Sequence, residues 1–343
     1  MKKKVVFCLT LCLMCIVAIV FLGEMASRVR FREEVYFIRN PDHRLVRNSR
    51  ETNSDGIRCG REAADFHPDQ LNVIILGDSF VYGNHSRPEF ALPQQFEQIA
   101  RAEHPERQIN VANFGWGSSS PYLSLRLLRD IGHKYSPDVV FLCVDVTDYH
   151  DDIKYKHFIE KDRLIYKTMD AFPGLVALLS WSLRELSLPR LYEQIFDLPL
   201  DVFFVVNQPL SNSRPWLTGT LNAIDHIALY VRDELQARFV LVILPRSFQY
   251  SAKECPNNWE KEAYAIMGPY AREPFRFFSE VKTVVKYPIY SLLETFETSK
   301  VFPLYLDDDP HWTKEGNTVA ARALYDIATD EGIFFEPSAR SRN

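Results

Sequence analysis

The sequence lacks several features that would point to particular classes of protein. It has no basic stripe, and its formal net charge is −5, so we expect no nucleic-acid partner. It contains no internal repeat and no low-complexity tract. Its six cysteines show no metal-ligand spacing, and we expect neither a metal nor a cofactor. The 343 residues are 46% hydrophobic, which is enough for one large domain, with or without insertions.

The first residues predict a membrane anchor. Three lysines precede an uncharged run from Val5 to Gly23, and 19 residues of helix can just cross a hydrocarbon core. The lysines favour a cytoplasmic start, which places residues from about 24 onward in the periplasm or outside the cell. A cleaved signal peptide is the alternative, but no clear cleavage site follows the run. We therefore expect 1–23 to be a transmembrane anchor in the cytoplasmic membrane.

The cysteines fall into groups that this topology separates. Cys143 lies in an apolar run and is expected to pack as a small hydrophobic residue. Cys59 and Cys255 would lie in an oxidising compartment and could form one disulfide, although the sequence does not show that they approach each other. The remaining three lie within the predicted anchor: Cys8, Cys12 and Cys15.

Beyond a polar juxtamembrane stem at 24–70, strands and helices alternate in one domain at 71–335. This alternation is typical of a doubly wound parallel sheet between two helical layers. Short apolar runs predict five strands, at about 71–76, 108–113, 138–146, 239–244 and 289–293. Apolar spacing predicts helices at 93–103, 118–134, 217–236, 259–286 (with breaks at Gly268-Pro269 and Pro274) and 317–329.

A segment at about 149–216 interrupts this alternation. It is rich in aromatic residues and leucine, and it predicts amphipathic helices at 173–187 and 189–196. We interpret it as an insertion packed over the ligand-binding edge of the sheet. It could act as a lid, or it could equally be additional core or a surface for a partner.

Ser79 is the candidate nucleophile because it follows the first predicted strand and the turn at Gly77. In open α/β sheets, ligands bind at the carboxyl ends of the strands. A serine hydroxyl needs an imidazole to remove its proton, and the imidazole needs a carboxylate to orient it. His311 has Asp308 and Asp309 three and two residues before it. The backbone N–H groups of Ser79 and of Gly115 could stabilise an oxyanion.

These residues resemble the sequence blocks of the SGNH, or GDSL-type, hydrolase superfamily. Gly77-Asp78-Ser79 resembles its first block, Asn113-Phe114-Gly115 its second, and Asp308-Asp309-Pro310-His311 its fifth. The resemblance covers 71–148 and 218–330. It implies a flavodoxin-like α/β/α sandwich with strand order 2-1-3-4-5, catalysis by Ser79 and His311, and an oxyanion contact from Gly115.

The third block departs from the family pattern. The family has Gly-x-Asn-Asp there, and its asparagine donates a side-chain N–H to the oxyanion, whereas this chain has Thr147 before Asp148. Losing one such donor can slow an enzyme by about 10²–10³-fold, although a threonine hydroxyl can also donate. The expected oxyanion donors are therefore Ser79, Gly115 and Thr147, and the activity could be weak, shifted to another acceptor, or absent.

The stem and the phrase His311-Trp-Thr-x-x-Gly-Asn317 resemble a membrane-anchored bacterial subgroup that includes relatives of alginate O-acetyltransferases. These relatives often have Asp-x-His, which would select Asp309 over Asp308; we give the two equal weight. The resemblance implies a serine esterase or O-acyltransferase acting on acylated envelope carbohydrate or exopolysaccharide, with polysaccharide-biosynthesis proteins as possible partners. The alternatives are a catalytically degenerate binding or assembly subunit and a lysophospholipase.

Overall fold

The computed structural model describes residues 2–40, 42 and 51–335 of the chain. The chain divides into two compact units. We call residues 1–43 and 154–201 the N-terminal unit, and residues 44–153 and 202–343 the sheet unit. The predicted stem at 24–70 divides between the two, and its residues 41 and 43–50 lie outside the described part of the chain.

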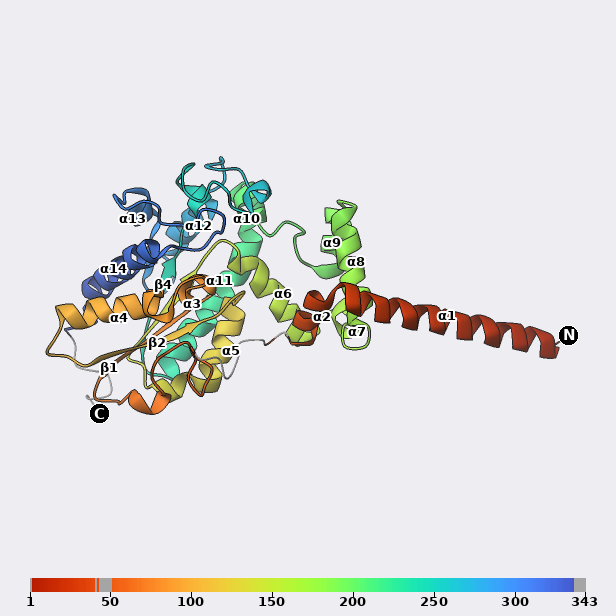
Figure 1. Cartoon of the computed structure of the whole chain (residues 1–343), viewed down its shortest axis with the longest axis horizontal. Coiled ribbons are helices and arrows are strands. Elements are labelled where there is room, and N and C mark those ends of the chain that lie inside the picture. The colour runs from red at the N-terminus through yellow and green to blue at the C-terminus, as the bar shows by residue number, and fades with distance from the viewer. Residues whose placement is uncertain (1, 41, 43–50, 336–343) are drawn as a thin grey trace. The chain divides into compact units, whose positions relative to one another are not determined.

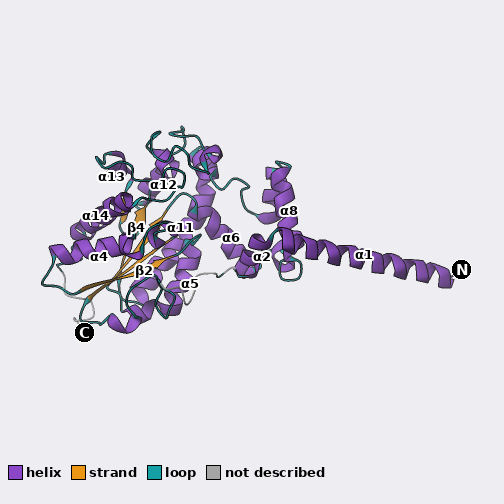
Figure 2. Cartoon of the chain, in the orientation of Figure 1, coloured by secondary structure: helices purple, strands orange, loops and turns teal. Residues whose placement is uncertain are grey.

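The sheet unit is built on a five-stranded, fully parallel sheet with the order β2-β1-β3-β4-β5. This confirms the predicted strand order. It also confirms the α/β sandwich, since helices surround the sheet (Figures 1 and 2). All seven residues of β1 are buried, as expected for a strand covered on both faces. The strands are β1 Leu71–Gly77, β2 Ile109–Gly115, β3 Val139–Val144, β4 Arg238–Ile243 and β5 Ile289–Ser291.

Helices cover both faces of the sheet. Val73 and Ile75 of β1 join a core cluster with Phe96 of α4 and Leu324 of α14. On the opposite face, α5 packs against α11, and α11 also contacts β4. Successive strand residues point to opposite faces, so the continuous apolar run of β1 supplies both cores. The helices of this unit are α3 Ser79–Tyr82, α4 Leu92–Glu103, α5 Pro121–Ile131, α10 Phe204–Asn207, α11 Leu210–Asp233, α12 Glu273–Val281, α13 Leu293–Glu297 and α14 Lys314–Asp330.

Two predicted helices have other bounds than expected. The helix predicted at 217–236 begins earlier, at Leu210, and keeps Pro215 inside it. The helix predicted at 259–286 forms only as α12, after a 3₁₀ turn at Lys261–Ala263. Pro274 is tolerated in the first turn of α12 because its missing N–H would have had no acceptor within the helix.

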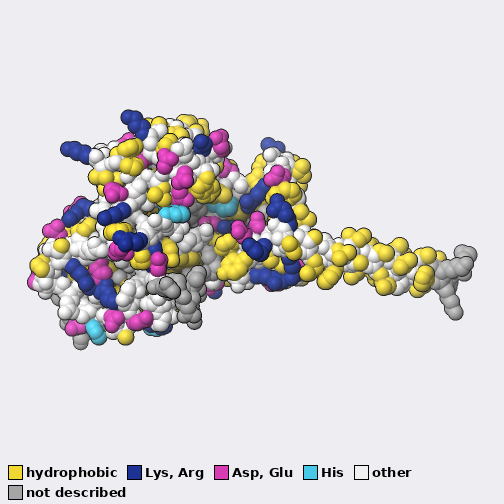
Figure 3. All heavy atoms as spheres, viewed as in Figure 1, with side chains coloured by type: hydrophobic (Ala, Val, Ile, Leu, Met, Phe, Trp, Pro, Cys, Tyr) yellow, Lys and Arg dark blue, Asp and Glu magenta, His cyan; other side chains and the backbone are white. Residues whose placement is uncertain are grey.

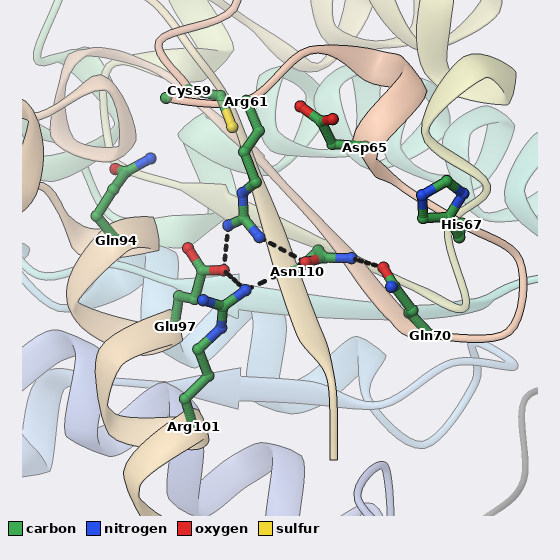
Figure 4. A pocket seen from close by; sticks show the side chains of 10 residues that line it. Cys59, Arg61, Asp65, His67, Gln70, Gln94, Glu97, Arg101 and Asn110 are labelled. Atoms are coloured by element: carbon green, nitrogen blue, oxygen red, sulfur yellow. Dashed lines mark hydrogen bonds and ion pairs between the residues drawn. The ribbon is translucent and has the colours of Figure 1, made fainter. Parts of the chain in front are cut away.

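The stem residues after 51 cover the edge strand β2. Arg61 donates to Asn110 at the start of β2 and to Glu97 of α4, and Arg101 donates to the same two side chains (Figure 4). Unpaired strand edges invite association with other chains. This polar network therefore serves to protect the edge of the sheet.

The N-terminal unit contains helices from both of its segments: α1 Lys2–Arg30, α2 Arg32–Arg39, α7 Leu164–Thr168, α8 Pro173–Glu185 and α9 Pro189–Phe196. Helix α6, Asp148–Glu160, starts in the sheet unit and ends in this one. Helix α1 is long and apolar enough to cross a membrane (Figure 3). Residues 154–201, the middle of the predicted insertion, group with α1 rather than with the sheet.

Candidate active site

The end of β1 places Ser79 at the carboxyl edge of the sheet. Gly77 allows this close turn because a Cβ there would come within 2.4 Å of Val81 Cγ2 and 3.0 Å of Cys143 O. The Asp78 side chain then accepts a hydrogen bond from Phe80 N (2.9 Å) and caps the short helix α3. Ser79 is the first residue of α3, and its amide has no acceptor within the helix.

His311 lies in the loop that precedes α14, and both sides of that loop are fixed. Its carbonyl accepts from Leu306 N (3.0 Å), and its own amide donates to Asp309 Oδ1 (3.0 Å). Thr313 caps α14 by accepting from Gly316 N (3.1 Å). Gly316 must be a glycine here, because a Cβ would meet Leu304 O at 2.1 Å.

The structure brings Ser79, His311 and Asp309 together. Ser79 Oγ lies 2.7 Å from His311 Nε2, and His311 Nδ1 is hydrogen-bonded to Asp309 Oδ1. An ionised carboxylate only accepts, so Nδ1 carries the proton and Nε2 is free to accept the serine proton. Asp308 is exposed, and its described contact is a backbone one, from Trp259 N to its carbonyl (3.3 Å). Of the two predicted carboxylates, Asp309 is therefore the one that orients His311.

Packing between the neighbours of Ser79 and His311 joins these distant segments. Phe80 and Trp312 are both 2% exposed, and their ring centroids are 4.8 Å apart. The Phe80 ring also lies 5.3 Å from the His311 ring. Burying two large aromatic side chains contributes on the order of several kcal/mol, which holds the two catalytic candidates in register.

The surroundings of the pair lower the pKa of both His311 and Asp309. Burial lowers the pKa of His311, and the neighbouring Arg246 and His85 lower it further, so that together they outweigh the opposing effect of Asp309. Burial would raise the pKa of Asp309, but hydrogen bonds from the His311 ring and amide outweigh it and hold that pKa below its ordinary value. A neutral imidazole beside an ionised carboxylate is the state that a general base requires.

Two of the three predicted oxyanion donors have other acceptors here. The Gly115 amide donates to Asn113 Oδ1 (3.0 Å). The Thr147 hydroxyl donates to Asp145 Oδ1 (2.8 Å), as does the Thr147 amide (2.7 Å). An oxyanion role for Gly115 or Thr147 requires its donor to exchange this acceptor for the substrate oxygen. The glycine at 115 has a packing role in any case, since a Cβ would meet Tyr82 N at 2.4 Å.

A buried cluster of three carboxyl groups lies beside the site, formed by Asp78, Asp145 and Asp148. Burial raises the pKa of both Asp78 and Asp148, and neighbouring carboxylates raise them further. Arg246 bonds the third member, Asp145, with Nε 2.5 Å from Asp145 Oδ2. Arg246 also contacts Glu260 (2.8 Å) and donates to the Thr147 hydroxyl (3.2 Å).

Two residues that contact this site, Arg246 and His85, were not predicted from the sequence. Arg246 follows the carboxyl end of β4, and the rule that such ends form sites could have found it. His85 Nε2 lies 3.4 Å from Asp309 Oδ2, and its ring centroid is 5.5 Å from that of His311. His85 is six residues after Ser79 in the same connection, but no local pattern marks it.

Two groups of described residues have the side-chain types and spacing of metal ligands: Asp78 with Asp145 and Asp148, and His85 with Asp309 and His311. In the second group, His311 already uses both ring nitrogens, one on Ser79 and one on Asp309. In the first group, the Arg246 guanidinium already supplies a positive charge to Asp145. His311 in one group and Asp145 in the other thus already have partners within the protein.

A separate polar pocket of about 520 Å³ lies along the edge strand β2 (Figure 4). Its two arginines, Arg61 and Arg101, are both paired with Glu97. Ser79, His311 and Asp309 are not among the residues that line it. The paired charges give it a structural role in holding the segment after residue 51 to the sheet.

The two cysteines considered for a disulfide are free and lie in different parts of the sheet unit. The Cys59 thiol donates to Val111 O on β2 (3.7 Å). The Cys255 thiol donates to Asp309 O (3.1 Å) and so contacts the loop that carries His311. Burial raises the pKa of both thiols, which lowers their reactivity as thiolates.

No family model matches this sequence, and neither does any curated protein sequence. Several solved structures are similar to it, among them the following three. The esterase EstA from Pseudoalteromonas sp. is 12% identical with a TM-score of 0.41, and the match covers 76% of this chain and 97% of that one. An acetyl-xylooligosaccharide esterase from Geobacillus is 14% identical with a TM-score of 0.41, and the match covers 79% of this chain and 98% of that one. A GDSL-like lipase from Bacteroides thetaiotaomicron is 11% identical with a TM-score of 0.39, and the match covers 87% of this chain and 100% of that one. These identities are low, so the roles of side chains are assigned from this chain's own geometry.

Proposed function

We propose that the sheet unit is a serine-dependent ester hydrolase or O-acyltransferase of the SGNH type. The observation that carries this proposal is the continuous hydrogen-bonded chain from Ser79 Oγ through the His311 ring to Asp309 (2.7 Å for its first link). In an alternative role as a binding subunit, nothing would require these three side chains to be aligned in the order that nucleophilic catalysis uses.

The reaction follows from the placement of these groups. Ser79 Oγ attacks the ester carbonyl carbon while His311 Nε2 takes the hydroxyl proton, and Asp309 stabilises the imidazolium. The resulting oxyanion is stabilised by the Ser79 amide and by further donors that reorient towards it. His311 then gives its proton to the departing alcohol, which leaves an acyl-Ser79 intermediate. Water or a sugar hydroxyl, deprotonated by His311, attacks that acyl group and releases Ser79.

We propose acylated carbohydrate of the cell envelope as the substrate and the outer side of the cytoplasmic membrane as the location. The apolar helix α1 supports attachment to a membrane, where envelope carbohydrate is assembled or modified. Proteins of polysaccharide biosynthesis are then the partners to test. Water as the acceptor gives an esterase, and a sugar hydroxyl gives a transferase.

A fluorophosphonate probe tests the nucleophile in the detergent-solubilised full chain. We expect the wild type to be labelled and Ser79→Ala not to be labelled, with kcat on a short acyl ester reduced by about 10⁶-fold in the variant. Ser86→Ala, at a half-buried serine in the same connection, is the matched control and should label normally. Equal absence of labelling in the folded wild type and in Ser79→Ala would contradict the proposal and favour a binding subunit.

A second set of assays identifies the acyl acceptor and the preferred length of the acyl chain. Short and long p-nitrophenyl esters are compared with and without added oligosaccharide. Preference for acetyl esters supports an acetylesterase, and acyl transfer to the oligosaccharide identifies a transferase. Release of long-chain fatty acid from lysolipid in preference to short esters would instead identify a lysophospholipase.

A further inference from the structure

Helix α8 is docked directly onto α1 within the N-terminal unit. The Glu24 carboxylate of α1 accepts from Gly174 N (3.0 Å) and Leu175 N (2.8 Å), the first free amides of α8, and from Arg28 Nε (2.5 Å). A Cβ at Gly174 would come within 2.7 Å of Glu24 O, so the two backbones are in close contact. The start of α8 is thereby fixed at one level along α1.

That level coincides with the end of the apolar run of α1. Leu175 Cδ2 lies 3.7 Å from the position of a Cβ on Gly23, the last residue of the run. Just before α8, Ala171 and Phe172 line a groove of about 380 Å³ together with Val17, Val20 and Phe21 of α1. If α1 crosses a bilayer, these side chains of α1 lie among the acyl chains. The corner between α7 and α8 is then at the same depth.

A stripe of apolar side chains runs along α8 from this corner. Its members are Phe172, Leu175, Leu179 and Leu186, whose spacing of three, four and seven residues places them on one helical face. Phe172, Leu179 and Leu186 are 42%, 36% and 66% exposed. In Figure 1, α8 runs across the line of α1 rather than along it. A helix at that orientation lies in the plane of a membrane that α1 crosses.

The polar groups near this corner have partners, as a site in contact with lipid requires. Glu24 is 4% exposed and is satisfied by the three donors named above. Arg28 also donates to Ala171 O (3.3 Å), and the exposed Asp170 pairs with Lys161 (3.0 Å). The charged residues of α8, Arg184 and Glu185, fall outside the apolar stripe.

We propose that α8 lies in the surface of the bilayer that α1 crosses, with the stripe Phe172–Leu175–Leu179–Leu186 facing the lipid acyl chains. The occupant of this surface is lipid because the stripe is continuous with the lipid-facing surface of α1. Such an in-plane amphipathic helix binds through its apolar face while its charged face stays in the headgroup region. The proposal depends on α1 spanning the membrane but is independent of the chemistry at Ser79.

Tryptophan quenching by brominated lipids tests the proposal in the full chain. Leu186→Trp and the adjacent Glu185→Trp are reconstituted separately in phosphatidylcholine–phosphatidylglycerol nanodiscs, with and without bromine on the acyl chains. The emission that each variant adds to the wild type is compared. We expect bromolipid to cause a loss of the added emission for Leu186→Trp and no loss for Glu185→Trp. Leu179→Trp should behave as Leu186→Trp does.

Carbonate extraction of native membranes is run in parallel. If the chain stays in the membrane but the added emission of Leu186→Trp is unquenched, the stripe does not face lipid and the proposal is overturned. If carbonate releases the chain, the membrane placement of α1 fails, and this proposal fails with it. In both cases the probe labelling of Ser79 can still succeed, so the proposed enzymatic function is judged separately.

Discussion

Asp309 and the buried pair Asp78 and Asp148 lie at the same edge of the sheet, but their pKa values are shifted in opposite directions. Asp309 is partly exposed, accepts from His311 and lies 3.4 Å from a second histidine, His85, and its pKa lies below the ordinary value. Asp78 and Asp148 are buried beside other carboxylates, and their pKa values lie above it. The chemical group is the same in each case. Its surroundings lower the pKa of Asp309 and raise the pKa of the buried carboxyls.

The acidic groups of this site therefore fall into two pairs with different roles. Asp309 is hydrogen-bonded to the His311 imidazole, which would act on the substrate. Asp145 forms an ion pair with Arg246, which is 6% exposed and also contacts Glu260 and Thr147. The first pair is arranged for proton transfer, and the second holds together the carboxyl ends of β3 and β4.

The strongest test of this comparison is to neutralise each of the two neighbouring aspartates before His311. Asp309→Asn should reduce kcat by about 10⁴-fold, because the amide can stabilise the wrong imidazole tautomer and cannot stabilise the imidazolium. Asp308→Asn, at the exposed neighbour, is the matched control and should retain activity. Steady-state kinetics on a short acyl ester provide the measurement. Loss in Asp308→Asn with normal activity in Asp309→Asn would reverse the assignment.

Removing the arginine should affect folding stability more than any exposed ion pair does. Arg246→Ala leaves Asp145, whose side chain is fully buried, and Glu260 without their cation. We expect a loss of about 3–5 kcal/mol in the free energy of unfolding.

Arg322→Ala is the control for this measurement, since its pair with Glu103 is 49% and 48% exposed and should contribute at most about 1 kcal/mol. Urea denaturation of the full chain in detergent, followed by near-UV circular dichroism, gives both values. Equal destabilisation by the two variants would show that the buried cluster does not depend on Arg246.

The buried carboxyls of raised pKa should tolerate the substitution that Asp309 does not. A protonated carboxyl and an amide are similar in shape and charge, so in Asp148→Asn the amide oxygen could still accept from Asp145 N, as the Asp148 carboxyl does at 2.7 Å. This variant should therefore change the free energy of unfolding by no more than about 1 kcal/mol and leave the pH of half-maximal kcat/KM unchanged. Strong destabilisation at pH 7 would mean that Asp148 is ionised and that the contrast with Asp309 is smaller.

The smallest expected effect concerns His85. A positive charge on His85 opposes protonation of His311, so it lowers the pKa of His311, as do burial and Arg246. Because the base must be neutral, the acid limb of kcat/KM should fall below the ordinary histidine value of 6.5 in the wild type. His85→Gln removes the charge, raises the pKa of His311 and should move that limb to higher pH.

Arg87→Gln is the charge-matched control for the pH profile, because Arg87 is two residues away and pairs with Glu89 rather than with Asp309. Its acid limb should coincide with that of the wild type. An acid limb that moves to lower pH in His85→Gln would contradict the sign of this argument.

The residues of the site differ in how far the sequence could predict them. Ser79 and His311 could be found from strand ends and motif spacing, because a buried strand, a glycine turn and a polar loop are local patterns. Asp308 and Asp309 could not be distinguished, since both lie close enough in sequence to reach the ring. Their distinction depends on a loop conformation that Leu306, Thr313 and Gly316 fix through contacts outside the motif.

The oxyanion donors and the insertion were harder to predict for a related reason. Gly115 and Thr147 have the expected positions in the chain, yet their donors bond to Asn113 and Asp145. Spacing specifies where a donor lies but not which acceptor it finds. The 149–216 segment shows apolar helices in its sequence, but an apolar face does not identify the surface that covers it. Residues 154–201 group with α1, to which Glu24 ties the first turn of α8.

The parallel sheet and the apolar N-terminal helix could be predicted from contiguous residues, because burial pattern and length are local properties, and the family resemblance added the strand order. Three features became visible only in the folded chain: Asp309 rather than Asp308 contacts the imidazole, Arg246 and His85 lie beside the site, and α8 packs against α1. These contacts depend on side chains that are distant in sequence or on loop geometry. A local sequence pattern does not specify such contacts.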